Sequence, residues 1–245
     1  MSDAIDRPKR RRGRAAAIGL TKAQVVAAAI EQIDNKGLSG FSLRELARSL
    51  GVSPTVIYWH VGGRQEDLFA EISAVITASL AEGLTEYQDP KLRLREVFLR
   101  YRELVLKHPK VAPLLGAQMK SNGVANLIWV ETVLSALSDM GFKDGLLRDA
   151  FNSLIGGLAG FVTMELAPPP AGDSSGWQEV FADRVKDISP ENYPCTHAAL
   201  PTITNQIFVL RWQNGEDISY AGSFEFLLDL LLDGLERRAQ RLHNS

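Results

Sequence analysis

The sequence is poor in cysteine and has no apolar stretch long enough to cross a bilayer. Cys195 is the only cysteine among 245 residues and cannot form an internal disulfide, which is typical of a reducing compartment. The longest nearly unbroken apolar run covers only residues 154–164, whereas a membrane-spanning helix needs about 20 residues. Residues 15–20, which follow a basic stretch, are too few for the apolar core of a secretory signal. We therefore expect no membrane partner and a location inside the cell.

The sequence also lacks the patterns of common catalytic and metal sites. The histidines at positions 60, 108, 197 and 243 have no paired metal-ligand spacing, and neither a Gly-x-Ser-x-Gly motif nor a phosphate-binding glycine loop is present. Cys195 has only His197 nearby, and the surrounding prolines favour a surface loop over an enzyme site. We expect no catalytic residue, no metal and no cofactor, with a small-molecule-binding enzyme as an alternative.

Charge is unevenly distributed, although the net charge is only −2. Residues 1–70 carry eleven Lys and Arg against seven Asp and Glu, whereas residues 71–245 carry sixteen against twenty-two. Six of the positive charges lie in residues 7–14, where no residue can pack into a core, so we expect residues 1–18 to form a disordered basic arm. The arm alone is compatible with a solubilising tail or a nucleic-acid contact. The overall hydrophobic content of 45% excludes a disordered chain.

The first seventy residues contain three short helical patterns. Each begins at an N-cap residue and ends near a glycine: Thr21, Ser42 and Ser53 for the starts, and Gly37, Gly51 and Gly62 for the ends. The three-residue turn 51–53 between the second and third patterns is the connection of a helix-turn-helix motif, with the small Ala47 at the helix crossing. We expect residues 19–64 to form a helix-turn-helix DNA-binding domain. The alternative is an ordinary pair of capped helices.

The third pattern leaves an unusual set of side chains for its outer face. These are Thr55, Tyr58, Trp59 and His60. Exposed rings are unfavourable unless they contact a partner, and phosphate oxygens and base edges suit hydroxyl, imidazole and indole groups. This face therefore predicts DNA contacts, although Trp59 could instead pack against the first helix.

The remainder of the chain reads as helical, which makes the fold all-α. We expect one continuous helix over residues 64–87 and a long loop over 167–194 with one helical turn near 177–185. Residues 203–212 fit a strand or a helix, and the helical context with Pro201 favours a helix. The other expected helices cover residues 89–106, 109–118, 122–140, 145–166 and the last part of the chain.

Two of these segments predict burial on more than one side. Residues 224–235 are apolar in nearly every direction around the helix axis, and Gly156, Gly157 and Gly160 give another helix a face of small residues. A monomer could bury one such helix at its centre. Two together favour a subunit interface, so we expect a homodimer.

The motifs at 40–47 (Gly-Phe-Ser-Leu-Arg-Glu-Leu-Ala), 50–53 (Leu-Gly-Val-Ser) and 57–61 (Ile-Tyr-Trp-His-Val) resemble the DNA-binding domain of the TetR family. Residues 226–236 are similar to the last helix of its tetracycline repressor subgroup. The resemblance implies a homodimeric repressor of the bacterial cytoplasm, associated with the nucleoid, that binds a palindromic DNA operator and is released by an effector. It also implies that residues 65–245 form a helical effector-binding and dimerisation domain. A constitutive DNA-binding protein without an effector is the alternative.

The resemblance assigns residues to DNA contact. By it, Arg44 reads a guanine edge, Pro54 and Thr55 contact bases, and the basic arm adds phosphate or minor-groove contacts. Proline at position 54 replaces a polar base reader, so the operator cannot be copied from the subgroup. The full predicted set is Arg11, Arg12, Arg14, Arg44, Pro54, Thr55, Val56, Tyr58, Trp59, His60 and Arg64.

The resemblance also implies an effector pocket that differs from that of the tetracycline repressor. Glu165 matches a glutamate that helps to hold a magnesium–drug chelate, but the subgroup's histidine and polar contact positions are Leu80, Val97, Leu115, Val133 and Gly157. A lone carboxylate cannot replace the missing imidazoles, so we expect no tetracycline–magnesium binding. With Tyr101, Trp129 and Leu158 added, the pocket suits a small hydrophobic or aromatic effector. For each apolar member, plain core packing is the alternative.

Overall fold

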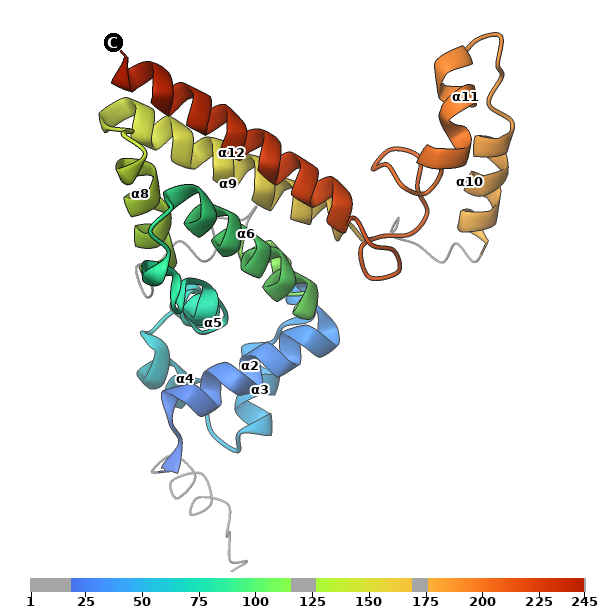
Figure 1. The fold of residues 1–245 in the computed structure, drawn as a ribbon. Helices are drawn as coiled ribbons and strands as arrows, with labels where there is room; N and C mark the ends of the chain where they lie inside the picture. Colours follow the sequence, from blue (N-terminus) through green and yellow to red (C-terminus); the bar gives the residue numbers. More distant parts are fainter. Residues whose placement is uncertain (1–18, 116–126, 169–175, 245) are drawn as a thin grey trace, which may run out of the picture.

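The computed structural model describes residues 19–115, 127–168 and 176–244, and every regular element within these ranges is helical (Figure 1). The all-α prediction is therefore confirmed for the described chain. The basic arm with Arg11, Arg12 and Arg14 lies outside the described residues, as do the parts of the predicted helices that fall in 116–126.

The elements form three groups along the chain. The first is α2 to α5, the second is a bundle of α6, α8, α9 and α12, and the third is the pair α10 and α11, which projects from the bundle as an arm (Figure 1). In chain order the elements are α2 (Lys22–Lys36), η1 (Leu38–Gly40), α3 (Leu43–Ser49), α4 (Pro54–Val61), α5 (Gln65–Ile76), η2 (Thr77–Ala81), η3 (Leu84–Glu86), α6 (Pro90–Lys107), α7 (Ala112–Leu115), α8 (Ile128–Asp139), α9 (Asp144–Glu165), α10 (Trp177–Lys186), α11 (Pro194–Ile203) and α12 (Ala221–His243).

The prediction of one continuous helix over 64–87 is wrong. The α-helix ends at Ile76 and continues as two short 3₁₀ segments. The Thr77 hydroxyl donates to the carbonyl of Ser73 at 2.7 Å, and Gly83 adopts a left-handed conformation that separates the two segments. Residues 65–86 together are long and apolar enough to cross a membrane by length and composition alone. Their buried members, such as Leu68 and Ile72, belong to the protein core.

Two predictions about residues 167–212 are also wrong. In place of a loop with one turn, Trp177–Lys186 forms a full ten-residue helix. In place of a helix over 203–212, α11 ends at Ile203 and the chain turns back on itself. Asn205 causes this turn, because its side-chain oxygen accepts from the backbone N–H of Trp212 at 3.0 Å and of Gln213 at 3.1 Å.

The apolar side chains form two clusters that meet at the end of α6. One fills the bundle and the other fills α2 to α5, and Leu104 and Leu115 pack against both. Val111 and Leu114 follow α6 in the sequence but lie in the second cluster, with α2 to α5. The two parts of the chain therefore share apolar packing where they join.

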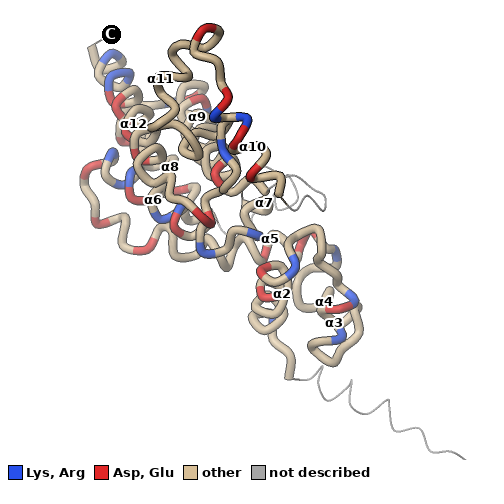
Figure 2. The backbone as a smooth tube through the Cα atoms, turned by 90° about the vertical axis from the view of Figure 1, so that its right-hand side faces the viewer, with Lys and Arg blue, Asp and Glu red and all other residues tan. Residues whose placement is uncertain are grey.

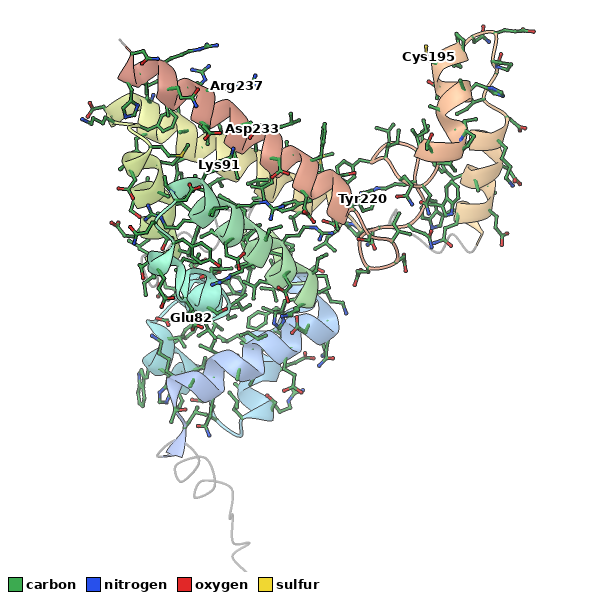
Figure 3. The ribbon with its side chains drawn as sticks, viewed as in Figure 1. Glu82, Lys91, Cys195, Tyr220, Asp233 and Arg237 are labelled. Carbon is green, nitrogen blue, oxygen red and sulfur yellow. The ribbon has the colours of Figure 1, made fainter. Side chains whose placement is uncertain are left out.

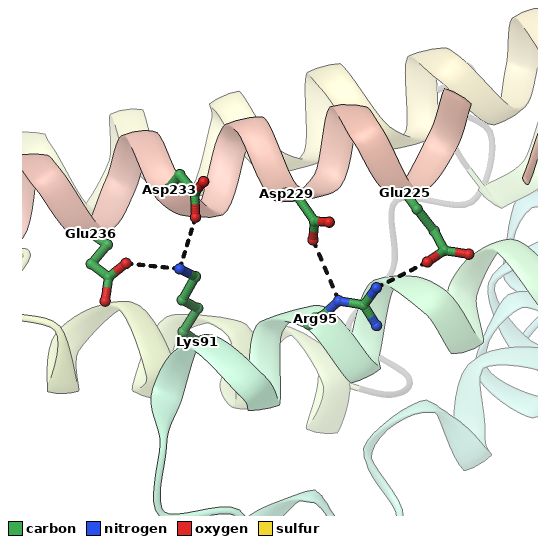
Figure 4. A network of polar contacts seen from close by, with 6 residues as sticks. All are labelled: Lys91, Arg95, Glu225, Asp229, Asp233 and Glu236. Carbon is green, nitrogen blue, oxygen red and sulfur yellow. Dashed lines mark hydrogen bonds and ion pairs between the residues drawn. The ribbon is translucent and has the colours of Figure 1, made fainter. Parts of the chain in front are cut away.

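Charged side chains connect α6 with α12 along the bundle surface (Figure 4). Lys91 pairs with Asp233 at 2.8 Å and with Glu236 at 2.7 Å, and Arg95 pairs with Glu225 at 2.9 Å. Hydrogen bonds to Asp233 and Glu236 raise the pKa of Lys91, and the Lys91 ammonium lowers the pKa of Asp233. These pairs hold the two helices in register at the solvent side.

We expect Lys91→Met to lower the melting temperature by a few degrees at pH 7 and by less near pH 3. A carboxyl with a lowered pKa contributes stability above its unfolded pKa and loses it as the pH falls through the folded pKa. The wild type should therefore lose its advantage over the variant in acid, which thermal unfolding at several pH values would measure. Lys107→Met, which removes an exposed pair with Glu103, is the control. Equal losses at pH 3 and pH 7 would contradict an electrostatic role for Lys91.

Candidate DNA interface and effector site

The turn between α3 and α4 has the geometry of a helix-turn-helix motif. Ala47 is buried at the crossing, and its carbonyl accepts from the N–H of Val52 at 3.0 Å. Gly51 has a φ of +68°, the left-handed conformation that the turn requires. At the far end of α4, Gly62 has a φ of +123°, and a Cβ there would lie 2.9 Å from the Cβ of Asp67. Gly51 thus fixes the turn before the eight-residue α4, and Gly62 fixes its C-terminal end.

The structure separates the two faces of α4 clearly. Ile57 and Val61 are buried in the cluster of α2 to α5, whereas Thr55 is exposed and Trp59 is 79% exposed. The alternative in which Trp59 packs against the first helix is therefore wrong. The other predicted contacts on this helix, Pro54, Val56, Tyr58 and His60, are half-buried. The helix α4 therefore presents the Thr55 hydroxyl and the Trp59 indole to solvent, while its opposite face is packed in the core.

Two arginines flank α4 in space and remain accessible. Arg44 on α3 is exposed, and its guanidinium has no partner among the described residues. Arg64 is the N-cap of α5, where its backbone N–H donates to Asp67 at 3.0 Å and its exposed guanidinium lies 3.6 Å from the same carboxylate. Figures 1 and 2 place α3 and α4 at the end of the molecule opposite the C-terminus.

The predicted caps have mixed outcomes. The Thr21–Gln24 capping box is present in full. Ser42 accepts from the N–H of Glu45, and the carboxylate of Glu45 pairs with Lys36 at 2.6 Å, which lowers the pKa of Glu45. Ser53 occupies the N-cap of α4 without a side-chain bond. The Glu45 carboxylate therefore braces α3 against α2.

A polar contact joins the bundle to α2. Nδ1 of His108, the residue after α6, lies 2.9 Å from Oδ2 of Asp34, and the Lys110 ammonium donates to the carbonyl of Asn35 at 3.1 Å. Val111 and Leu114 pack beside this contact. The end of α6 is thus attached directly to the helix-turn-helix unit.

The predicted effector residues are packed together inside the bundle. Leu80, Val97, Val133 and Leu158 are at most 1% exposed and belong to one cluster. Tyr101 donates to the carbonyl of Leu115 at 3.4 Å, and burial raises the pKa of its phenol to about 12. Leu115, Trp129 and Gly157 are half-buried. The arrangement fits an apolar site as well as plain core packing.

Glu165 has a partner that the sequence interpretation missed. Its fully buried carboxylate accepts from Nε of Arg102 at 3.0 Å and from Nη2 at 2.6 Å. The guanidinium of Arg102 also lies 5.5 Å from the ring centroid of Phe224. The sequence signal for this partner is the position of Arg102 directly after the buried Tyr101, because that position lies next to the core face of α6. Within the described ranges, no group of three His, Cys, Asp or Glu residues could hold a metal ion.

The outer faces of α9 and α12 are apolar and open. Phe226 is 67% exposed and Leu230 is 56% exposed, and both lie on α12. On α9, a Cβ at Gly156 or Gly160 would meet nothing within 4 Å, whereas one at Gly157 would lie 3.0 Å from Leu231. Figure 1 shows the two helices side by side along one edge of the bundle.

Comparisons with known proteins agree with these features. Residues 25–72 match the family described as "Bacterial regulatory proteins, tetR family", and residues 86–239 match "Tetracyclin repressor-like, C-terminal domain". The Tetracycline repressor protein class A from transposon 1721 of Escherichia coli is 24% identical over 236 residues, which cover 92% of this chain and 96% of that protein. AcrR of Shigella flexneri is 33% identical over 88 residues, and these cover 34% of this chain but only 40% of AcrR.

A solved structure supports the same fold. Apo ActR from Streptomyces coelicolor superimposes with a TM-score of 0.68 at 20% identity, covering 91% of this chain and 98% of ActR. ActR has also been solved in complex with actinorhodin, and this form superimposes with a TM-score of 0.63.

Proposed function

Because the chain belongs to the TetR family of bacterial transcriptional regulators, we propose that it is a repressor that binds a palindromic operator as a homodimer and leaves it when a small hydrophobic or aromatic effector binds. The observation that carries the proposal is the outer face of α4, where Thr55 and Trp59 are exposed near Arg44, whose guanidinium has no partner in the described part of the chain. We place the protein in the bacterial cytoplasm, on DNA.

The proposed DNA contacts divide by chemistry. Arg44 is suited to a guanine, because a guanidinium can bond O6 and N7 together, and Pro54 and Thr55 begin α4 nearest to the bases. Tyr58, His60 and Arg64 are suited to phosphate, with Val56 and Trp59 against the groove wall. Arg11, Arg12 and Arg14 add contacts from the basic arm.

The contact between α6 and α2 supports a route for release. Two recognition helices of a dimer must lie about 34–36 Å apart to enter successive major grooves. An effector that moves α6 would carry His108 and its partner Asp34 with it and change this spacing. If the effector prefers the released state a hundredfold, it contributes about 2.7 kcal/mol for each occupied site.

We place the effector in the bundle, among the predicted residues around Tyr101, Trp129 and Leu158. The Arg102–Glu165 pair forms the polar edge of this effector site. Arg102 already satisfies the carboxylate of Glu165, so the effector need not supply a cation. A tetracycline–magnesium chelate is not the proposed ligand, since the imidazoles it needs are absent from the matching positions. A panel of apolar compounds should raise the melting temperature of the protein, whereas a constitutive DNA-binding protein would not respond.

A gel shift with an operator selected from genomic fragments tests DNA binding and its residues. We expect Arg64→Ala to weaken binding to all sequences and to reduce the salt slope by about 1, because one phosphate contact is lost. Arg44→Ala should instead cost about 1–3 kcal/mol on the selected operator and relax the preference at one base pair. Lys186→Ala, which removes an exposed charge from α10, is the control. The assignment fails if Arg44→Ala lowers affinity for selected and random duplexes equally.

A further inference from the structure

We propose that a second small-molecule site lies at the base of the α10–α11 arm and takes a planar aromatic anion. The site shares no lining residue with the bundle residues given above, and its occupancy can be measured without DNA. Figure 3 shows Tyr220 at the joint where the arm meets the start of α12, and the site lies at this joint.

The pocket is lined by aromatic rings from two segments. Trp177 and Phe181 come from α10, and Phe208 and Trp212 come from the turn after α11. Its volume is about 340 Å³, at the lower end of the range for small-molecule sites, which suits a compound of two or three rings. The centroids of Phe181 and Trp212 are 6.4 Å apart at an interplanar angle of 63°, so the walls present both ring faces and ring edges.

The positive charge in this pocket comes from Arg211. Its guanidinium donates to the carbonyl of Glu165 at 3.1 Å and to the carbonyl of Met164, and it lies 5.1 Å from the centroid of Phe208. No carboxylate pairs with it among the described residues, so carbonyls and rings fix its position while its charge stays uncompensated. A fixed, partly buried cation without a counter-ion favours an anionic ligand group. Neither Trp177 nor Trp212 donates its indole N–H to an acceptor in the described chain.

The pocket is held open by bonds that do not involve its ligand-facing groups. Asn205 binds the backbone of Trp212 and Gln213, and the N–H of Gly215 donates to the carbonyl of Glu165 at 2.8 Å. A Cβ at Gly215 would overlap Cγ of Glu165, so the turn fits closely against the end of α9. Asp217 also lines the pocket and forms no ion pair with any described residue, so a ligand with a single acidic group fits the pocket better than one with several.

Two fluorescent probes of the same shape and different charge test the site. 8-Anilinonaphthalene-1-sulfonate is a planar aromatic anion, and N-phenyl-1-naphthylamine is its neutral counterpart. We expect Arg211→Met to weaken binding of the anionic probe about tenfold, which corresponds to the loss of one charge-assisted hydrogen bond. The affinity for the neutral probe should not change. Asp217→Asn should strengthen binding of the anionic probe. This substitution should leave the fold intact, because the Asp217 side chain makes no bond within the described chain.

A filling variant and a bundle control separate this site from the effector site. Ala167→Trp places a ring in the pocket and should abolish the part of the anion's saturable binding that depends on Arg211, whereas Trp129→Phe in the bundle should leave that part intact. The proposal is overturned if Ala167→Trp binds the anion as the wild type does, or if Arg211→Met and Asp217→Asn leave its affinity unchanged. If the wild type bound no operator, the proposed repressor function would be wrong. The probe affinities would still test the site at the base of α10 and α11.

Discussion

Leu230→Arg is expected to convert the protein from dimers to monomers and to weaken operator binding by at least about a hundredfold. Leu230 and Phe226 are more than half exposed on α12, beside the open glycine face of α9. In a twofold interface each substitution occurs twice, so two guanidiniums would be buried near the same axis without counter-ions, at a cost of several kcal/mol. A monomer engages one half-site and loses the gain of the linked second contact. Light scattering would give the mass, and a gel shift the affinity.

Leu92→Arg is the matched control for this substitution. Leu92 is 49% exposed on α6, so its arginine variant changes charge and apolar area by a similar amount on another surface. We expect it to stay dimeric with unchanged melting temperature. If Leu230→Arg remained dimeric at micromolar concentration, the α9–α12 face would not be the interface and the proposed operator geometry would lose its basis.

Local signals predicted the helix-turn-helix unit well because its chemistry is short-range. Thr21 and Gln24 bond to each other within one turn, Gly51 supplies a positive φ at a single position, and Pro54 starts a helix that is complete within eight residues. The period of apolar residues on these helices matches their burial, so Ile57 points inward and Trp59 outward. None of these features depends on distant parts of the chain.

The arm and the Arg102–Glu165 pair were missed because they depend on contacts between distant residues. Residues 203–212 have an apolar pattern, but one side chain, Asn205, competes for the backbone and turns the chain. The apolar pattern of α6 predicts that the helix face next to Tyr101 is close to the core. It does not identify Glu165, 63 positions later, as the carboxylate that pairs with Arg102. The sequence therefore predicts the surface proposed to contact DNA better than it predicts the surroundings of Glu165.

Arg102→Met is expected to destabilise the protein by about 3–5 kcal/mol, which is the range for removing one partner of a buried ion pair. Glu165 is fully buried and accepts two bonds from Arg102, so the variant would leave a carboxylate without its cation in the bundle. The double variant Arg102→Met with Glu165→Leu removes both charges and should recover most of the loss, because an apolar pair of similar volume needs no desolvation of ions. Urea unfolding of the wild type, both single variants and the double variant completes the thermodynamic cycle. If the two single losses simply add in the double variant, the carboxylate and the guanidinium are not coupled, and Glu165 would be free to serve as a ligand group in the bundle.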